Sequence, residues 1–382
     1  MTDQPVYRVG IIGGGRQGTE HAIAYRQHPR TELAAVADTD AENLDLFRQR
    51  FGVPGYSDYH EMLAKETVDI SGPILPVKAN PDAVVASAEA GVKAVFSEKP
   101  LAGSLVDADR MVEACASRGI PFAAGLVVSS HPDYNKAYRL AAEGAIGEVL
   151  RINLYDGNNQ VGTHGLNLVR KFADKSQVDF VTGFVEGDPH ATQEDDFGDG
   201  KPGYGKIGGY VRFNNGIEAF SSYTGPSWRG IEVVGTQGLL YNSNNTGLGF
   251  RMWTVGDGVD PKTHPELREV EGVFSPRGSG EREYDEQGWR VPSEVLMKCI
   301  DGLVEAMDTG KPPEMTTGDD LRHSLEIDIA LRESARRGGA PVKLPIEDRS
   351  IEMYPQRGRW HYKKDVHGAE WYREAMKIHQ RE

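Results

Sequence analysis

The chain has 382 residues and a formal net charge of −14, with 38% hydrophobic and 26% charged residues. These proportions are ordinary for a globular protein, and the length favours two domains. The negative charge argues against nucleic acid as a partner, and no apolar run approaches the ~18 residues of a membrane span. Two cysteines are too few for a disulfide framework and lack metal-ligand spacing. We therefore expect a cytoplasmic protein without a metal site.

The first 126 residues alternate apolar, strand-like runs with helix-like runs. The strand-like runs are 7–12, 33–37, 68–75, 94–96 and 122–124. The helix-like runs are 19–28, 41–51, 59–65, 81–90 and 105–118. This alternation predicts an α/β domain with a doubly wound parallel sheet, a Rossmann domain, over residues 1–126.

A G-x-G-x-x-G motif, Gly13, Gly15 and Gly18, connects the first strand-like run to the first helix-like run. In such a motif the first glycine makes the turn, the second lets the backbone approach a pyrophosphate, and the third allows close helix–strand packing. The N-terminus of the helix then offers unpaired N–H groups to the phosphates. Arg16 and Gln17 lie inside the motif, and we assign them to the same cofactor site.

Asp38 ends the second apolar run, twenty residues after Gly18. A carboxylate at this place accepts hydrogen bonds from an adenosine ribose and repels a 2′-phosphate, so we expect NAD rather than NADP. Asp40 and Glu42 follow, and no Lys or Arg stands nearby in the sequence. A basic residue distant in the sequence can still reach the phosphate position.

Ser97-Glu98-Lys99-Pro100 follows the run 94–96, at the strand end where doubly wound folds place ligands. Lys99 is suited to donating a charged hydrogen bond to a substrate hydroxyl, which assists its deprotonation. Glu98 is suited to pairing with Lys99 or with the nicotinamide ribose. A solvated strand-to-helix loop is an equally good interpretation of the spacing alone.

After residue 130 the pattern changes from strand–helix alternation to short alternating runs. A helix-like run, 132–144, is followed by strand-like runs at 148–156, 208–213, 217–223 and 231–234. Two further helices are expected at 293–308 and from a capping box at Thr317-x-x-Asp320 to Gly338. We predict an α+β domain with an open, mostly antiparallel sheet over residues 127–345. An aromatic C-terminal extension, 346–382, packs on its own chain or on a neighbour.

His164 follows Gly162-Thr163 and opens an apolar-periodic helix. A neutral imidazole at the positive end of a helix suits a general base that takes a hydroxyl proton as hydride leaves. A histidine that merely starts a helix is the competing interpretation. Trp228 is suited to stacking on a sugar or to packing in the core. His190 with the acidic residues 194–196 lacks compact ligand spacing, which favours a solvated loop.

Together, the glycine motif, Glu98-Lys99-Pro100 and the Gly-x-His helix start resemble the glucose–fructose oxidoreductase / inositol dehydrogenase (Gfo/Idh/MocA) family over about residues 5–345. The resemblance implies that Lys99 and His164 flank the substrate carbon, opposite the nicotinamide. It also implies subunit contacts through the C-terminal sheet, and so a homo-oligomer, dimer or tetramer.

Several positions depart from the family's pattern. Gln160 stands where an Asp is usual, four residues before His164, and Asn167 stands where an Asp is frequent. We assign Gln160, Thr163, Asn167 and Trp228 to the substrate. Neutral amides and hydroxyls suit an uncharged polyol or sugar better than an acid. The segment after the third apolar run also departs from the pattern, and from it we assign Pro76 and Asn80 to the cofactor.

The leading hypothesis is an NAD-dependent dehydrogenase that acts on a secondary hydroxyl of a sugar, cyclitol or sugar derivative. A redox-type glycosidase of the same family, which retains its NAD, is one alternative. A non-catalytic NAD-binding sensor is the other, because Gln160 replaces the usual Asp.

Overall fold

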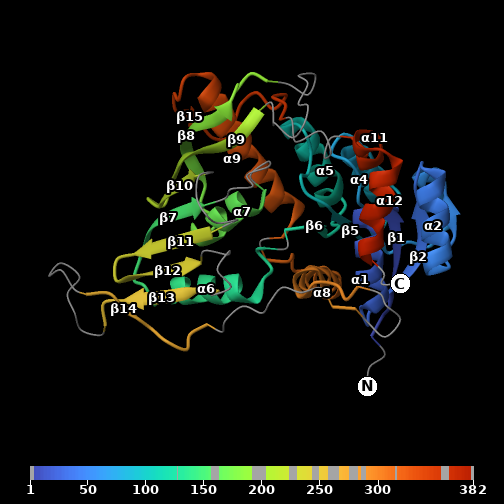
Figure 1. Ribbon diagram of the computed structural model, residues 1–382, viewed down its shortest axis with the longest axis horizontal. Helices are drawn as coiled ribbons and strands as arrows, with labels where there is room; N and C mark the ends of the chain where they lie inside the picture. Colours follow the sequence, from blue (N-terminus) through green and yellow to red (C-terminus); the bar gives the residue numbers. More distant parts are fainter. Residues whose placement is uncertain are drawn as a thin grey trace. The chain divides into compact units, whose positions relative to one another are not determined.

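The computed structural model describes residues 4–126, 128–155, 163–191, 204–222, 230–242, 249–256, 266–274, 283–284, 290–314, 316–353 and 361–379. The chain forms two compact units, each built around one sheet (Figure 1). The first unit combines residues 1–127, 282–322 and 355–382, and the second combines 128–281 and 323–354. Among the described residues, no helix is both long and apolar enough to cross a membrane.

The first unit contains a six-stranded sheet whose strands follow the order β3-β2-β1-β4-β5-β6. The strands are β1 (Tyr7–Ile12), β2 (Thr31–Ala37), β3 (Gly55–Tyr56), β4 (Ile70–Pro73), β5 (Ala94–Ser97) and β6 (Phe122–Ala124). Every pair is parallel. The order reverses between β1 and β4, and a doubly wound sheet binds its ligand at that point.

Helices cover both faces of this sheet, which explains why its strands are almost continuously apolar. They are α1 (Arg16–Gln27), α2 (Ala41–Phe51), α3 (Tyr59–Lys65), α4 (Asn80–Glu89), α5 (Leu105–Ala116) and α8 (Glu294–Thr309). On one face, Val9 and Ile11 of β1 pack with residues of α1, α2 and α8. On the other face, Ile12 packs with residues of α3 and α4.

The C-terminal part of the chain returns to the first unit. Helices α11 (Lys363–His367) and α12 (Ala369–Met376), with the 3₁₀ turn η3 (Lys377–His379), lie against this unit (red in Figure 1). Tyr372 and Met376 are buried on α12. The expected C-terminal extension, 346–382, is therefore split between the two units. Residues 346–353 belong to the second unit, and residues 361–379 belong to the first.

The second unit contains a nine-stranded mixed sheet in the order β14-β13-β12-β11-β7-β10-β9-β8-β15. The strands are β7 (Val149–Tyr155), β8 (Val178–Gly187), β9 (Tyr204–Phe213), β10 (Glu218–Ser222), β11 (Gly230–Gly235), β12 (Gly238–Asn242), β13 (Arg251–Thr254), β14 (Arg268–Glu269) and β15 (Val342–Lys343). Only β7 and β10 pair in parallel, so the sheet is mostly antiparallel, as the sequence predicts.

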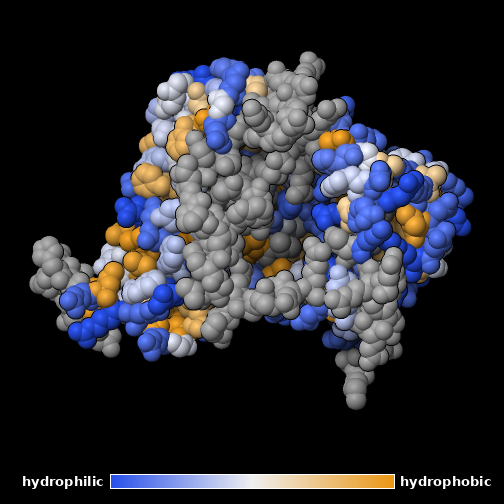
Figure 2. All heavy atoms as spheres, in the orientation of Figure 1, coloured by the Kyte–Doolittle hydropathy of each residue, from blue (hydrophilic) through white to orange (hydrophobic). Residues whose placement is uncertain are grey.

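Among the described residues, helices cover one face of the second sheet. They are α6 (Pro132–Ala142), α7 (Thr163–Phe172) and α9 (Gly318–Arg336). Two strand glycines allow α9 to approach, because a Cβ on Gly183 or Gly209 would collide with Leu331. The opposite face exposes aromatic side chains, and Phe184 and Phe220 are 49% and 43% exposed. Figure 2 shows hydrophobic residues among hydrophilic ones over β11 to β13.

The elements agree with the sequence pattern except at their ends, at six strands and at helices α11 and α12. Strand β8 was not among the expected runs, because Gly183 and Gly187 interrupt its alternation. The other unexpected strands are β3, β12, β13, β14 and β15. The Thr317–Asp320 capping box is present, with the Asp320 N–H donating to Thr317 Oγ1 at 3.0 Å. The Lys99–Pro100 peptide bond is cis.

Candidate NAD site

The glycine motif forms the turn between β1 and α1, where the backbone leaves no room for side chains. Gly13 has φ +99°, and a Cβ there would lie 2.5 Å from the Ile74 carbonyl oxygen. A Cβ on Gly18 would lie 1.8 Å from the Gly13 carbonyl oxygen. Helix α1 starts after Gly15 without a side-chain cap. Its first N–H groups therefore depend on a partner from elsewhere.

Asp38, at the end of β2, holds the glycine loop in place. Its Oδ2 accepts the Gly14 N–H at 2.8 Å, and its Oδ1 accepts the Asp40 N–H at 2.8 Å. Burial raises the pKa of the Asp38 carboxyl, and these two hydrogen bonds oppose that effect. The carboxylate thus has a structural task in addition to the ribose contact that the sequence predicts.

A cavity of about 400 Å³ opens beside this loop, entirely within the first unit. Nine of the ten expected cofactor residues line it: Gly13, Gly15, Arg16, Gln17, Gly18, Asp38, Pro76, Glu98 and Lys99. Asn80 does not line it. Its buried amide donates instead to Ser97 Oγ at 2.7 Å and to the Leu101 carbonyl at 3.1 Å. Asn80 therefore fixes the turn that carries Lys99.

Glu98 and Lys99 reach the cavity from the carboxyl end of β5. Glu98 Oε2 accepts the Lys99 N–H at 3.1 Å, and Glu98 Oε1 lies 3.0 Å from Nε2 of the buried His21 on α1. The backbone of Gly125 approaches this carboxylate closely, and a Cβ there would lie 2.7 Å from Oε1. The turn before Pro100 is therefore held from both sides.

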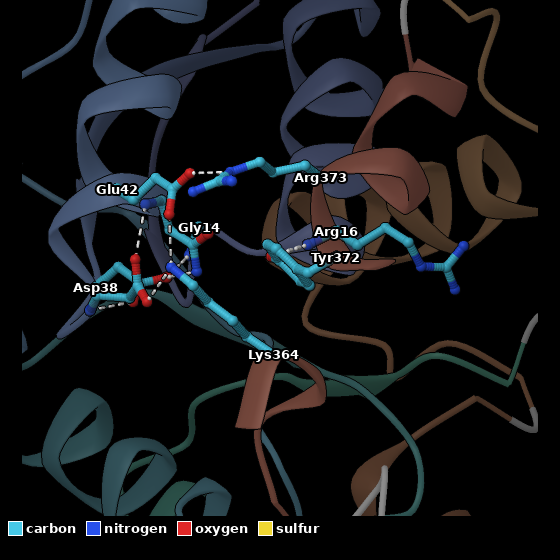
Figure 3. Close-up of polar contacts among 9 residues, drawn as sticks. Gly14, Arg16, Asp38, Glu42, Lys364, Tyr372 and Arg373 are labelled. Atoms are coloured by element: carbon cyan, nitrogen blue, oxygen red, sulfur yellow. Dashed lines mark hydrogen bonds and ion pairs between the residues drawn. The ribbon is translucent and has the colours of Figure 1, made fainter. Parts of the chain in front are cut away.

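Some of the lining residues that the sequence did not predict come from the C-terminal segment. Tyr362, Lys364 and Tyr372 all line it. Lys364 Nζ lies 2.8 Å from both Asp40 Oδ2 and Glu42 Oε2. Figure 3 shows the Lys364 side chain reaching towards Glu42.

Further along the segment, two more groups attach to the domain. Arg373 Nε donates to Glu42 Oε1 at 2.8 Å. The Tyr372 hydroxyl accepts the N–H of Arg16 at 3.0 Å, at the start of α1 (Figure 3). These contacts join positions more than 300 residues apart, so no local sequence motif predicts them.

Hydrogen bonds and burial shift the pKa values of Glu42, Asp40 and Tyr372 at the rim of the cavity. Hydrogen bonds from Arg373 and Lys364 lower the pKa of Glu42 to about 2. Burial raises the pKa of Asp40, but hydrogen bonds from Lys364 and the Asn43 N–H outweigh it, and the net shift is downward. Burial raises the pKa of Tyr372 to about 12. The hydroxyl is therefore neutral at physiological pH.

The expected substrate residues that the structure describes lie in the second unit, on α7. All ten residues of α7 are buried, including Thr163 and His164 in its first turn. Asn167 Nδ2 donates to Ser129 Oγ at 2.6 Å, and Asn167 Oδ1 accepts from Ser324 Oγ at 3.4 Å. This fully buried amide is engaged by protein groups, so we leave Asn167 out of the proposed substrate site.

Gln160 and Trp228 lie outside the described residues, as does the acidic stretch 194–196. Among the residues that are described, no group of three or more His, Cys, Asp or Glu side chains has a metal-binding arrangement.

Residues 7–126 match the family model GFO_IDH_MocA, described as an oxidoreductase family with an NAD-binding Rossmann fold. The Rossmann domain belongs to this oxidoreductase family. Its match covers β1 to β6 and therefore the glycine loop, Asp38 and Lys99. NAD is thus the cofactor class of the domain that contains the cavity.

Known proteins with related sequences support the same assignment. The chain is 32% identical over 152 residues to myo-inositol 2-dehydrogenase of Thermotoga maritima, covering 39% of this chain and 45% of that protein. It is 32% identical over 142 residues to D-apiose dehydrogenase of Paraburkholderia graminis, covering 37% and 38%. The matches span less than half of each of these two relatives.

Solved structures extend the similarity of the fold to most of the chain. A levoglucosan dehydrogenase in complex with NADH and levoglucosan aligns with a TM-score of 0.69 at 20% identity, covering 90% of this chain and all of that one. At this identity the alignment shows a shared two-part fold.

The residues of the family domain fit NAD. The three motif glycines stand where a Cβ would collide with a neighbour, and the neighbour nearest to the Cβ position of Gly15 is the Tyr372 hydroxyl, at 2.8 Å. Asp38 and Asp40 line the cavity beyond the carboxyl end of β2, and Glu98 and Lys99 line it at the carboxyl end of β5. Arg16 would meet the pyrophosphate through its backbone N–H.

Proposed function

We propose that the protein is an NAD-dependent oxidoreductase that moves a hydride between a secondary hydroxyl of a sugar, cyclitol or sugar derivative and the nicotinamide. One observation carries the proposal: Lys99 lines the same cavity as the glycine loop and Asp38. NAD, when bound, supplies the hydride acceptor. The chain itself binds the substrate and moves its proton.

Lys99 is the proposed donor to the reacting hydroxyl. An ammonium that hydrogen-bonds an oxygen stabilises negative charge as it develops there, and charge-assisted bonds of this kind contribute ~1.5–3 kcal/mol. The contact between Glu98 and the Lys99 N–H fixes the backbone from which the side chain projects.

His164 is the proposed general base, acting from the first turn of α7. A neutral imidazole accepts the hydroxyl proton as the C–H bond breaks. Thr163, Gln160 and Trp228 remain proposed substrate contacts. The names of the relatives, which act on inositol and apiose, support a polyhydroxylated substrate.

The test is a panel of sugars and cyclitols with NAD, followed by NADH absorbance. Lys99→Ala should slow turnover at least about tenfold, because a charged hydrogen bond to the transition state is lost. Lys93→Ala, at an exposed lysine paired with Asp69, is the matched control and should keep the wild-type rate. A Lys99 variant at the wild-type rate would remove Lys99 from the mechanism.

His164→Ala tests the proton acceptor. General acid–base catalysis contributes about 10²–10⁴-fold, so the variant should lose activity on that scale and recover part of it at high pH, where hydroxide substitutes. A loss that is independent of pH would return His164 to a structural role. Release of an aglycone from glycosides without net NADH formation would instead identify a redox glycosidase.

A further inference from the structure

The C-terminal strap, defined here as residues 361–379, occupies part of the site that NAD must use. Tyr372 Oη lies 3.0 Å from the backbone nitrogen of Arg16 and accepts its hydrogen. This N–H belongs to the helix start that a Rossmann fold directs at the pyrophosphate. The neutral hydroxyl therefore fills the acceptor position of a phosphate oxygen.

The same hydroxyl fills the space that the second motif glycine leaves open. It lies 2.8 Å from the position that a Cβ on Gly15 would take. The absence of that Cβ allows a pyrophosphate to approach the backbone. Two oxygens cannot occupy this space together, so the hydroxyl and a phosphate oxygen exclude each other.

Charged contacts hold the strap in this position. Lys364 pairs with Asp40 and Glu42, and Arg373 pairs with Glu42. These pairs lie at the rim, and the cavity behind them keeps a volume of about 400 Å³. The strap thus obstructs the pyrophosphate position, whereas Asp38, Glu98 and Lys99 still line the cavity.

We propose that the strap is an intrachain competitor of NAD, with the Tyr372 hydroxyl as the competing group. NAD binds after this hydroxyl leaves Arg16, and the strap returns when NAD dissociates. The apparent affinity for NAD is then lowered by the fraction of molecules whose strap is closed. This inference depends on NAD binding by the family domain and does not require the proposed dehydrogenase reaction.

The first test is Tyr372→Phe, which removes one oxygen and keeps the buried ring. The dissociation constant for NAD, measured by calorimetric titration, should fall about three- to tenfold, because one hydrogen bond no longer holds the strap closed. Stopped-flow measurements should show a faster association rate. An unchanged or higher dissociation constant would overturn the proposal, since the hydroxyl would then be irrelevant or would help to hold NAD.

A second variant tests the rim contacts without touching the cavity lining. Arg373→Gln removes an exposed ion pair with Glu42 and should lower the dissociation constant about twofold, with a smaller effect at high salt. Arg110→Gln, which removes an exposed pair with Asp82 in the same unit, is the matched control and should leave NAD binding unchanged. Equal effects of both variants would contradict the proposal.

Hydrogen exchange of the wild-type protein provides a test without substitution. Saturation with NAD should speed amide exchange in residues 369–376, because the strap loses its contact with Arg16. Slower or unchanged exchange in these residues would overturn the proposal, because the strap would then close over bound NAD or stay in place. None of these measurements requires turnover, so they remain informative if the dehydrogenase proposal fails.

Discussion

The two sheets of this chain differ in what covers them. The parallel sheet of the first unit has helices on both faces, and the C-terminal strap packs at the binding loop. The mostly antiparallel sheet of the second unit exposes Phe184 and Phe220 on one face. Parallel sheets occur almost only with both faces covered, whereas antiparallel sheets tolerate one open face. The candidate site of the covered sheet lies at its strand ends, and the second sheet offers a broad surface.

The largest effect on stability and NAD binding is expected at Gly18, where α1 packs tightly on β1. Gly18→Ala places a Cβ 1.8 Å from the Gly13 carbonyl oxygen, so α1 must shift away from β1. We expect the free energy of unfolding to fall by about 3 kcal/mol and NAD binding to be lost. Urea denaturation and NAD titration measure both.

Gly302→Ala is the control for Gly18→Ala. Gly302 lies within α8, and a Cβ there would lie 3.3 Å from Pro313. The free energy of unfolding should then stay within about 1 kcal/mol of wild type, since alanine is the better helix former. If Gly18→Ala matched this control, the tight packing of α1 on β1 would be disproved.

The next effect concerns a buried group of the strap and its pH dependence. Burial lowers the pKa of His379 to about 4, and Arg16, Arg50 and Arg290 act in the same direction. The folded protein therefore holds this ring neutral while the unfolded chain protonates it near pH 6.5. The neutral His379 ring therefore contributes to the free energy of unfolding in full above about pH 6.5. This contribution is lost as the pH falls towards about 4.

Urea denaturation between pH 7.5 and 4 measures this contribution, which is at most about 3 kcal/mol. His379→Gln should flatten the profile in that window. His367→Gln, at an exposed histidine of the same strap, should retain the wild-type profile. A wild-type slope that survives His379→Gln would assign the pH dependence to another group.

A smaller effect is expected at Asp38. Asp38→Ser removes the carboxylate that repels a 2′-phosphate and that accepts the Gly14 N–H. The preference for NAD over NADP should fall about tenfold, equivalent to ~1.4 kcal/mol. Parallel titrations with both dinucleotides measure it. An unchanged ratio would mean that the preference resides in Asp40 and Glu42.

The smallest effect on stability is expected on the open face. Phe184→Ser with Phe220→Ser should change the free energy of unfolding by only about 0.5 kcal/mol, because both rings are largely exposed. We expect the same variant to weaken self-association, measured by sedimentation velocity, if this face joins copies of the chain. Val106→Ser, at an exposed valine of α5, should leave the sedimentation profile unchanged.

Most of the covered sheet could be predicted from the sequence because its signals are local. Every strand except β3 overlaps an expected apolar run, and the glycine loop lies within a few residues of its helix. The partner of α8 could not be predicted in this way. Its apolar face shows that it packs on something, and only the structure shows Leu303 in the core of the first unit.

The candidate site likewise contains residues that the sequence predicts and residues that it does not. Gly13, Gly15, Asp38 and Lys99 follow strand ends, and parallel strands bring these ends to one edge. Tyr372 and Lys364 reach that edge from the far end of the sequence and follow no motif. Asn167 lies on a helix buried on every side, where periodicity cannot separate a substrate contact from a structural amide.

The discontinuity of the first unit has a consequence for the order of events during synthesis. The ribosome completes residues 7–126 long before α8, yet Tyr7 donates to Asp308 at 2.6 Å, and Ile300 and Leu303 belong to the core beside β1. Until α8 emerges, that apolar surface is open to water and to other chains. The core of the unit that begins first is therefore completed late, after strands β7 to β14 of the second sheet have been synthesised. A nascent chain stalled within the second unit would carry the complete glycine motif but only part of the core that supports it.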